Sequence, residues 1–182
     1  MHIQVQTPLR YDGKSIWLHW ITAILVILLW CIGETIDWFP RGTPRITMRS
    51  LHIVFGAVLG CILLYRIWWR STAGSRLPPA ETGVLRVLAT LVQFLLYATM
   101  LAAVIAGVAN AWVRGDTIFN LFTIPKFDPG NKELRETVEE IHELLAHAVL
   151  ILAALHTAAA LIHHFVWKDD VLRRMLAREG SS

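Results

Sequence analysis

The last long apolar stretch of the chain, residues 141–167, has the sequence IHELLAHAVLILAALHTAAALIHHFVW. It is long enough to cross a bilayer as a helix, because a span needs about 20 mostly apolar residues. His142 and His156 lie fourteen positions apart in it. Fourteen helical steps return to within about 40° of the starting direction and advance about 21 Å. The stretch therefore predicts a membrane helix with two imidazoles on one side, at two depths.

Three further apolar stretches precede this one, and 55% of the 182 residues are apolar. A mean hydropathy of +0.50 excludes an ordinary soluble domain. Because backbone groups in lipid must be hydrogen-bonded within their own segment, we expect helices. The predicted fold is an all-α membrane protein, a four-helix bundle forming a single domain over residues 1–182. The predicted spans are approximately 16–36, 50–69, 86–113 and 138–167.

Lysine and arginine are distributed unevenly between the two sides of such a bundle. Ten lie in the termini and the middle loop: Arg10, Lys14, Arg66, Arg70, Arg76, Arg86, Lys168, Arg173, Arg174 and Arg178. Seven lie in the other two loops: Arg41, Arg45, Arg49, Arg114, Lys126, Lys132 and Arg135. Positive charge accumulates on the cytoplasmic side, so we expect both termini in the cytoplasm. The basic tail is expected to face anionic membrane lipid, and no nucleic-acid partner is expected.

Two more histidines lie near the starts of earlier spans, His19 in the first and His52 in the second. If the helices alternate in direction, His52 is level with His142 on the outer side and His19 with His156 on the inner side. A low-spin haem iron takes two imidazoles, so the pattern predicts two b-type haems. No C-x-x-C-H motif is present, so they would be bound non-covalently. His163, seven residues after His156, points in nearly the same direction, and depth alone leaves both as possible partners of His19.

The remaining histidines of the last span allow two interpretations. His163 and His164, with Trp167, lie at the inner rim, where they would be either interfacial residues or contacts of a haem propionate or a quinone carbonyl. His147 is five residues after His142, on a different face, and is expected to be a packing residue.

Three arginines, Arg41, Arg45 and Arg49, lie in the predicted loop just before His52. They would either steer a small anion towards the outer haem or contact lipid headgroups. No catalytic residue is identified beyond this possible role.

Four stretches together resemble the bacterial cytochrome b561 family, and the resemblance covers nearly the whole chain. They are IWLHW at 16–20, LHIVFG at 51–56, IHELL at 141–145 and ALHTAAALIHHFVWKD at 154–169. The resemblance implies four helices, two b haems and electron transfer linked to quinone. It also implies that His19, His52, His142 and His156 are the iron ligands, which selects His156 over His163. One type within this family oxidises superoxide at the outer face and reduces ubiquinone.

We therefore expect a membrane oxidoreductase that moves electrons from an outer donor, such as superoxide, to ubiquinone. The first alternative is a haem b subunit that accepts electrons from a partner protein, such as a hydrogenase or a periplasmic cytochrome. The second is a histidine-lined transporter, which is disfavoured because the third span is polar only at uncharged positions such as Gln93 and Asn110.

Overall fold

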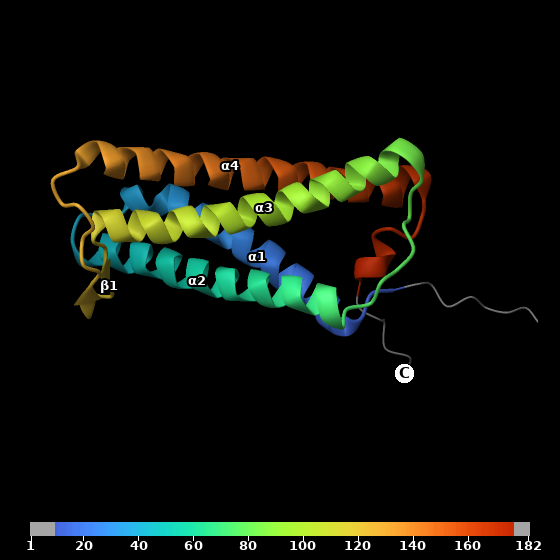
Figure 1. Cartoon of the computed structure of the whole chain (residues 1–182), viewed down its shortest axis with the longest axis horizontal. Helices are drawn as coiled ribbons and strands as arrows, with labels where there is room; N and C mark the ends of the chain where they lie inside the picture. The colour runs from blue at the N-terminus through green and yellow to red at the C-terminus, as the bar shows by residue number, and fades with distance from the viewer. Residues whose placement is uncertain (1–9, 177–182) are drawn as a thin grey trace, which may run out of the picture.

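Four long helices packed side by side form the computed structural model, which describes residues 10–176 (Figure 1). Their bounds are α1 Gly13–Thr35, α2 Thr43–Thr72, α3 Gly83–Arg114 and α4 Lys132–Ile162. Each is long and apolar enough to cross a membrane, as predicted from the sequence. Each begins three to seven residues before its predicted span. Arg178 of the basic tail lies outside the described residues.

Side-chain caps and special backbone conformations end the helices where the apolar stretches end. Asp12 caps α1 by accepting a hydrogen bond from the backbone N–H of Ser15 at 2.9 Å, and Asn131 does the same for α4 from Leu134. Such caps satisfy amides that have no partner inside the helix. Gly115 ends α3 with φ +66°, in the left-handed region that favours glycine.

Shorter elements join and follow the helices. They are the 3-10 turns Ile36–Trp38 and Arg173–Met175, the π-helical turn His163–Trp167, and the antiparallel strands β1 Thr117–Ile118 and β2 Phe122–Thr123. The small hairpin is a departure from the predicted all-α fold. Apolar and polar residues alternate in this loop, but no strands were predicted from that alternation.

The helices alternate in direction, with α3 packed along α4 and α1 packed along α2 (Figure 1). The start of α1 and the end of α4 lie at one end of the bundle, which we call the terminal end. The hairpin lies at the opposite end, which we call the hairpin end. Alternation of this kind places residues near the start of α2 level with residues near the start of α4.

The core of the bundle is small and apolar. Its buried members are Leu29, Leu59, Leu63, Met100 and Val149, which come from all four helices. Many other large apolar side chains lie on the outside of the bundle and are exposed, among them Ile24, Phe94 and Leu144. An apolar outer surface is expected where lipid replaces water as the solvent.

The hairpin is attached to the start of α2 through Ser50, whose side chain is completely buried. The backbone N–H of Phe119 donates to Ser50 Oγ at 2.8 Å, and Ser50 Oγ donates to the carbonyl of Ile46 at 2.7 Å. Ser50 is two residues before His52, so this attachment fixes the backbone next to that histidine.

Candidate functional site

The structure brings four histidines together as two pairs. At the hairpin end, His52 of α2 faces His142 of α4, with ring centres 6.0 Å apart and ring planes at 89°. Towards the terminal end, His19 of α1 faces His156 of α4, with ring centres 6.2 Å apart and planes at 68°. The ring opposite His19 is thus that of His156. α4 contributes one histidine to each pair.

The spacing within each pair fits two imidazoles that share one metal ion. A histidine nitrogen lies about 2.0 Å from the metal it binds and about 1.1 Å from its own ring centre, so two imidazoles that share one metal ion would hold their ring centres up to about 6.2 Å apart. The observed separations of 6.0 and 6.2 Å agree with this value. The side-chain geometry therefore fits two irons, each between two histidines.

A cavity of about 440 Å³ adjoins the pair at the hairpin end. His52 and His142 line it, together with apolar residues and small residues such as Gly33, Gly56 and Ala57. Cavities of this size, mostly apolar and with a few convergent polar groups, are typical of small-molecule and cofactor sites. Here the convergent groups include the two imidazoles.

Two glycines inside the spans make room for these imidazoles. A Cβ on Gly107 of α3 would lie 2.9 Å from Cε1 of His142, and one on Gly33 of α1 would lie 3.3 Å from Cε1 of His52. Neither glycine was predicted from the sequence as part of the site. The signal that could have found them is a glycine within a membrane span, which commonly marks close approach.

The other nitrogen of His142 is fixed by the backbone. His142 Nδ1 lies 3.0 Å from the carbonyl oxygen of Ala103. A carbonyl oxygen only accepts, so Nδ1 carries the proton and Nε2 is left with its lone pair. Metal-binding histidines commonly donate their second N–H in this way, which sets both the tautomer and the ring orientation.

The pair towards the terminal end has a different neighbour. Arg66 Nη2 lies 3.1 Å from His19 Nδ1, and the Arg66 guanidinium lies over the Tyr97 ring at 5.2 Å. A guanidinium only donates hydrogen bonds, so here Nδ1 of His19 accepts and a neutral His19 carries its proton on Nε2. Metal binding through Nε2 would move that proton to Nδ1 and end the Arg66 hydrogen bond. The two pairs thus differ in their second contacts.

A buried carboxylate lies between two arginines beside the cavity. Asp116 is 9% exposed, and its Oδ1 lies 3.5 Å from Arg49 Nη1 and 3.6 Å from Arg114 Nε. Arg114 also pairs with Glu139 at 2.7 Å. Burial raises the pKa of Asp116, although the two arginines act to lower it. This network was not predicted from the sequence, because its members are far apart in the chain.

The three arginines that precede His52 have different surroundings. Arg45 pairs with Asp37 at 3.1 Å and donates to the carbonyl of Phe39, so it holds the α1–α2 loop together. Arg41 is exposed. Arg49 lines the cavity next to His52. Of the three, Arg49 is therefore the one whose charge acts directly on the cavity.

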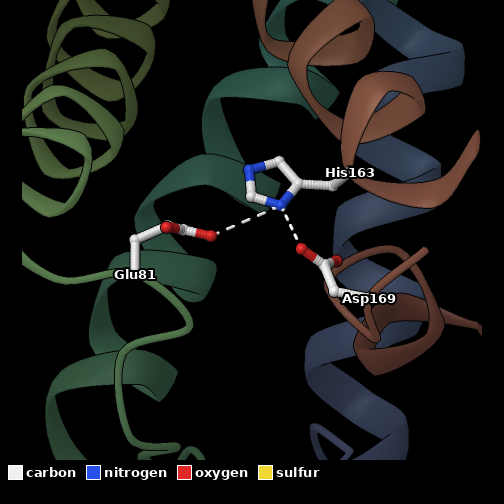
Figure 2. Close-up of side chains that lie close together, drawn as sticks. All are labelled: Glu81, His163 and Asp169. Carbon is white, nitrogen blue, oxygen red and sulfur yellow. Dashed lines mark hydrogen bonds and ion pairs between the residues drawn. The ribbon is translucent and has the colours of Figure 1, made fainter. Parts of the chain in front are cut away.

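The other predicted histidines lie outside the two pairs. His147 Nδ1 is 2.9 Å from the carbonyl of Glu143, and its ring packs against Trp30. His164 packs against Phe165, with ring centres 4.7 Å apart. His163 packs edge-on against Trp167 at 4.4 Å. Its Nδ1 also lies beside the carboxylates of Glu81 and Asp169, which the sequence analysis did not single out (Figure 2).

Apolar helices that pair imidazoles at a spacing suited to a shared iron are typical of membrane-embedded b-type cytochromes. The sequence profile described as prokaryotic cytochrome b561 matches residues 10–178. The chain belongs to this family, and is thus a multi-pass bacterial membrane protein of electron transfer whose family binds b-type haem.

Three curated relatives are similar to nearly the whole chain. "Cytochrome b561 homolog 1" of Escherichia coli is 32% identical, over 93% of this chain and 98% of the relative. "Probable superoxide oxidase CybB" of Yersinia pestis is 28% identical, over 93% and 97%. "Cytochrome b562" of Cereibacter sphaeroides is 28% identical, over 91% and 94%.

Proposed function

We propose that this chain is a single-domain cytochrome of the bacterial inner membrane that oxidises superoxide at the hairpin end and reduces ubiquinone. In this proposal it holds two non-covalent b haems, one between His52 and His142 and one between His19 and His156. The ring spacings of 6.0 and 6.2 Å support the two ligand pairs. The name of the Yersinia pestis relative supports superoxide as the donor.

The reaction balances as two one-electron oxidations and one two-electron reduction. Two superoxide ions each lose one electron and become dioxygen, while ubiquinone gains both electrons and two protons and becomes ubiquinol. When bound, a haem supplies an iron that takes up and releases one electron at a time. The protein has to bind the iron, admit the anion, exclude competing reactions and bring protons to quinone.

At the hairpin end, the chain's own residues would admit the anion and hold the ligands. Arg49 and Arg114 line the cavity and bring positive charge to it, partly compensated by Asp116 and Glu139. The carbonyl of Ala103 keeps the proton of His142 on Nδ1 and its Nε2 available to the iron.

At the terminal end, we propose that His163, His164 and Trp167 contact quinone or a haem propionate. Trp167 is 51% exposed on the outside of the bundle, where a quinone dissolved in lipid can reach it. This end carries the start of α1 and the end of α4 and would face the cytoplasm, because the larger share of lysine and arginine lies there.

The observation that most strongly supports the proposal is that the rings of His52 and His142 face each other beside a cavity lined by arginine. The test is to purify the protein in detergent and measure haem per polypeptide. Enzymatically generated superoxide is then added, and ubiquinol formation is followed with and without superoxide dismutase. We expect two haems per chain and quinol formation that the dismutase abolishes. A His52→Leu variant should retain one haem and lose the reaction with superoxide.

Two results would overturn parts of this proposal. Two haems without any reaction with superoxide, together with co-purification of a redox partner, would indicate an electron-transfer subunit. A wild-type protein with no haem would reject both ligand pairs.

A further inference from the structure

We propose that Glu81, His163 and Asp169 form a binding site for a divalent transition-metal ion such as Zn²⁺. Figure 2 shows one imidazole nitrogen facing two carboxylates, one from the loop before α3 and one from beyond α4. This site is separate from the two histidine pairs. It shares His163 with the proposed quinone or propionate contacts, but it does not depend on which donor or acceptor the protein uses.

The three groups present one ligand atom each within a small volume. His163 Nδ1 lies 2.6 Å from Asp169 Oδ2 and 3.4 Å from Glu81 Oε1, and all three atoms lie within 4.8 Å of one another. Two ligand atoms on one tetrahedral Zn²⁺ are about 3.3 Å apart, so the contact with Glu81 already has this spacing and that with Asp169 has to open by about 0.7 Å. A fourth position would be left for water, as in zinc sites with three protein ligands.

The charges of the cluster favour a cation. Nδ1 carries at most one proton, so it can donate a full hydrogen bond to only one of the two carboxylates. In the part of the chain that the structure describes, the one ion pair of Glu81 is with His163. Whether His163 is neutral or protonated, the cluster keeps a net negative charge, which a divalent ion would neutralise while binding all three atoms.

Asp169 is ionised and available to such an ion. Burial acts to raise the pKa of this carboxyl, but hydrogen bonds from His163 and from the backbone N–H of Val171 lower it below its usual value. The side chain of His163 is only 12% exposed and that of Glu81 is 23% exposed. One imidazole and two carboxylates, partly shielded from solvent, form a mixed N/O donor set. Such a set suits Zn²⁺ and other divalent first-row transition-metal ions better than Mg²⁺.

The backbone brings Asp169 to His163 by leaving the α-helix. Had α4 continued, a residue six positions on would lie about 9 Å further along the axis and about 120° around it. Instead the chain forms the π-helical turn His163–Trp167, and Lys168 takes φ +55°. The backbone N–H of Asp169 then donates to the carbonyl of His163 at 3.1 Å. Single π turns of this kind occur frequently at functional sites.

An ion at this position would join two segments far apart in sequence. Glu81 belongs to the loop that connects α2 to α3, whereas His163 and Asp169 follow the end of α4. Binding should therefore restrict the motion of that loop, which contains the exposed Arg76. Trypsin cleavage after Arg76 then becomes a second, independent measure of occupancy.

The test uses the haem-loaded protein in detergent, with a purification tag that contains no histidine. Zn²⁺ alone is added, and binding is measured by competition with a chromogenic chelator, with metal content determined after dialysis. We expect one Zn²⁺ per chain that Mg²⁺ in excess does not displace. Asp169→Asn and Glu81→Gln should each weaken binding by about tenfold or more, by analogy with the loss of other groups that support a metal site.

Asp170→Asn provides the matched control. Asp170 is the next residue, is exposed, and pairs with Arg173 at 3.3 Å instead of with His163. Its loss should leave Zn²⁺ binding and the Zn²⁺-dependent protection of Arg76 unchanged. The haem absorption spectrum checks that each variant is folded. Absence of saturable Zn²⁺ binding at sub-millimolar concentration, or equal binding by all three variants, would reject the site whether or not the protein oxidises superoxide.

Discussion

A Cβ placed on Gly107 of α3 would lie 2.9 Å from Cε1 of His142 on α4. Atoms of this kind are not found so close, so any side chain at position 107 has to push the imidazole away from its position opposite His52. Substitution of Gly107 is therefore a steric way to disturb one histidine pair while all four histidines remain in the chain.

We predict that Gly107→Val lowers the haem content from two per chain to about one, because the His52–His142 pair no longer holds its spacing. The loss should be seen in the pyridine haemochrome assay and in the redox titration, where one of two components disappears. Gly13→Ala is the control, since a Cβ there has nothing within 4 Å. Two haems in Gly107→Val would show that α3 does not limit this site.

Arg66 provides a test of the other pair. Its guanidinium lies 3.1 Å from His19 Nδ1, and a nearby positive charge stabilises the reduced state of an iron. We predict that Arg66→Leu lowers the midpoint potential of one haem by on the order of 50–100 mV, from the Coulomb energy of one charge at close range. Arg70, one turn further along α2, is exposed, so Arg70→Leu should shift neither potential appreciably.

Arg49 and Asp116 allow anion steering to be tested by two changes of opposite sign. Arg49→Gln removes a positive charge from the cavity, and Asp116→Asn removes the carboxylate that lies 3.5 Å from it. At low ionic strength, the rate constant for reduction of the protein by superoxide should fall in Arg49→Gln and rise in Asp116→Asn. Each change should be a factor of about 2 to 10. Both differences should shrink as salt is added.

The comparison is made at equal haem content, because Asp116→Asn also leaves Arg49 and Arg114 without their shared partner. Arg41→Gln, at an exposed position before α2, should have a smaller effect than Arg49→Gln. Equal rates in all three variants would indicate that these charges do not steer superoxide.

Asp12 gives the fold a pH dependence. Its carboxylate accepts hydrogen bonds from the backbone N–H of Ser15 and Ser75 and from the indole of Trp69. Burial acts to raise the pKa of Asp12, but these bonds lower it well below the ordinary value of 3.8. The carboxylate therefore stabilises the folded state above pH 3.8, and this contribution is lost as the pH falls through the lower, folded-state pKa.

We predict that Asp12→Ala lowers the free energy of unfolding at pH 7 by about 1–2 kcal/mol, as expected for the loss of a helix cap. The thermal midpoint, followed by loss of the haem absorption band, should fall by a few degrees (roughly 2–8 °C). The difference from the wild type should narrow in buffers below pH 3.8. If the difference in thermal midpoint between Asp12→Ala and the wild type stayed constant across this pH range, the effect would come from packing and not from the charge of Asp12.

The helices could be predicted from the sequence because lipid imposes a simple rule on length and polarity, and the histidines because imidazole is rare in such segments. The alternation of helix direction was enough to anticipate which rings lie level. The hairpin at 117–123 was not anticipated, since two-residue strands depend on Ser50 of a distant helix for their position.

Most of the residues that surround the histidines could not be predicted from the sequence. Arg66 contacts His19 from 47 positions away, and Asp116 meets Arg49 from 67 positions away. Such contacts depend on the rotation of each helix about its axis, which hydropathy does not determine. Asp169 was missed for another reason: its approach to His163 needs a break in helical periodicity.

Because α4 supplies one ring to each histidine pair, the two sites share a single rigid body. His142 and His156 lie about 21 Å apart along it, and a helix resists twisting between such points. The haem that binds first would fix the rotation of α4 about its axis. This would also orient the α4 histidine that the second haem needs. In the chain with both pairs intact, assembly of the holoprotein should accordingly be cooperative, with chains carrying both haems or neither more abundant than independent filling would produce. A variant that lacks one pair still holds a haem at the other pair, with weaker binding.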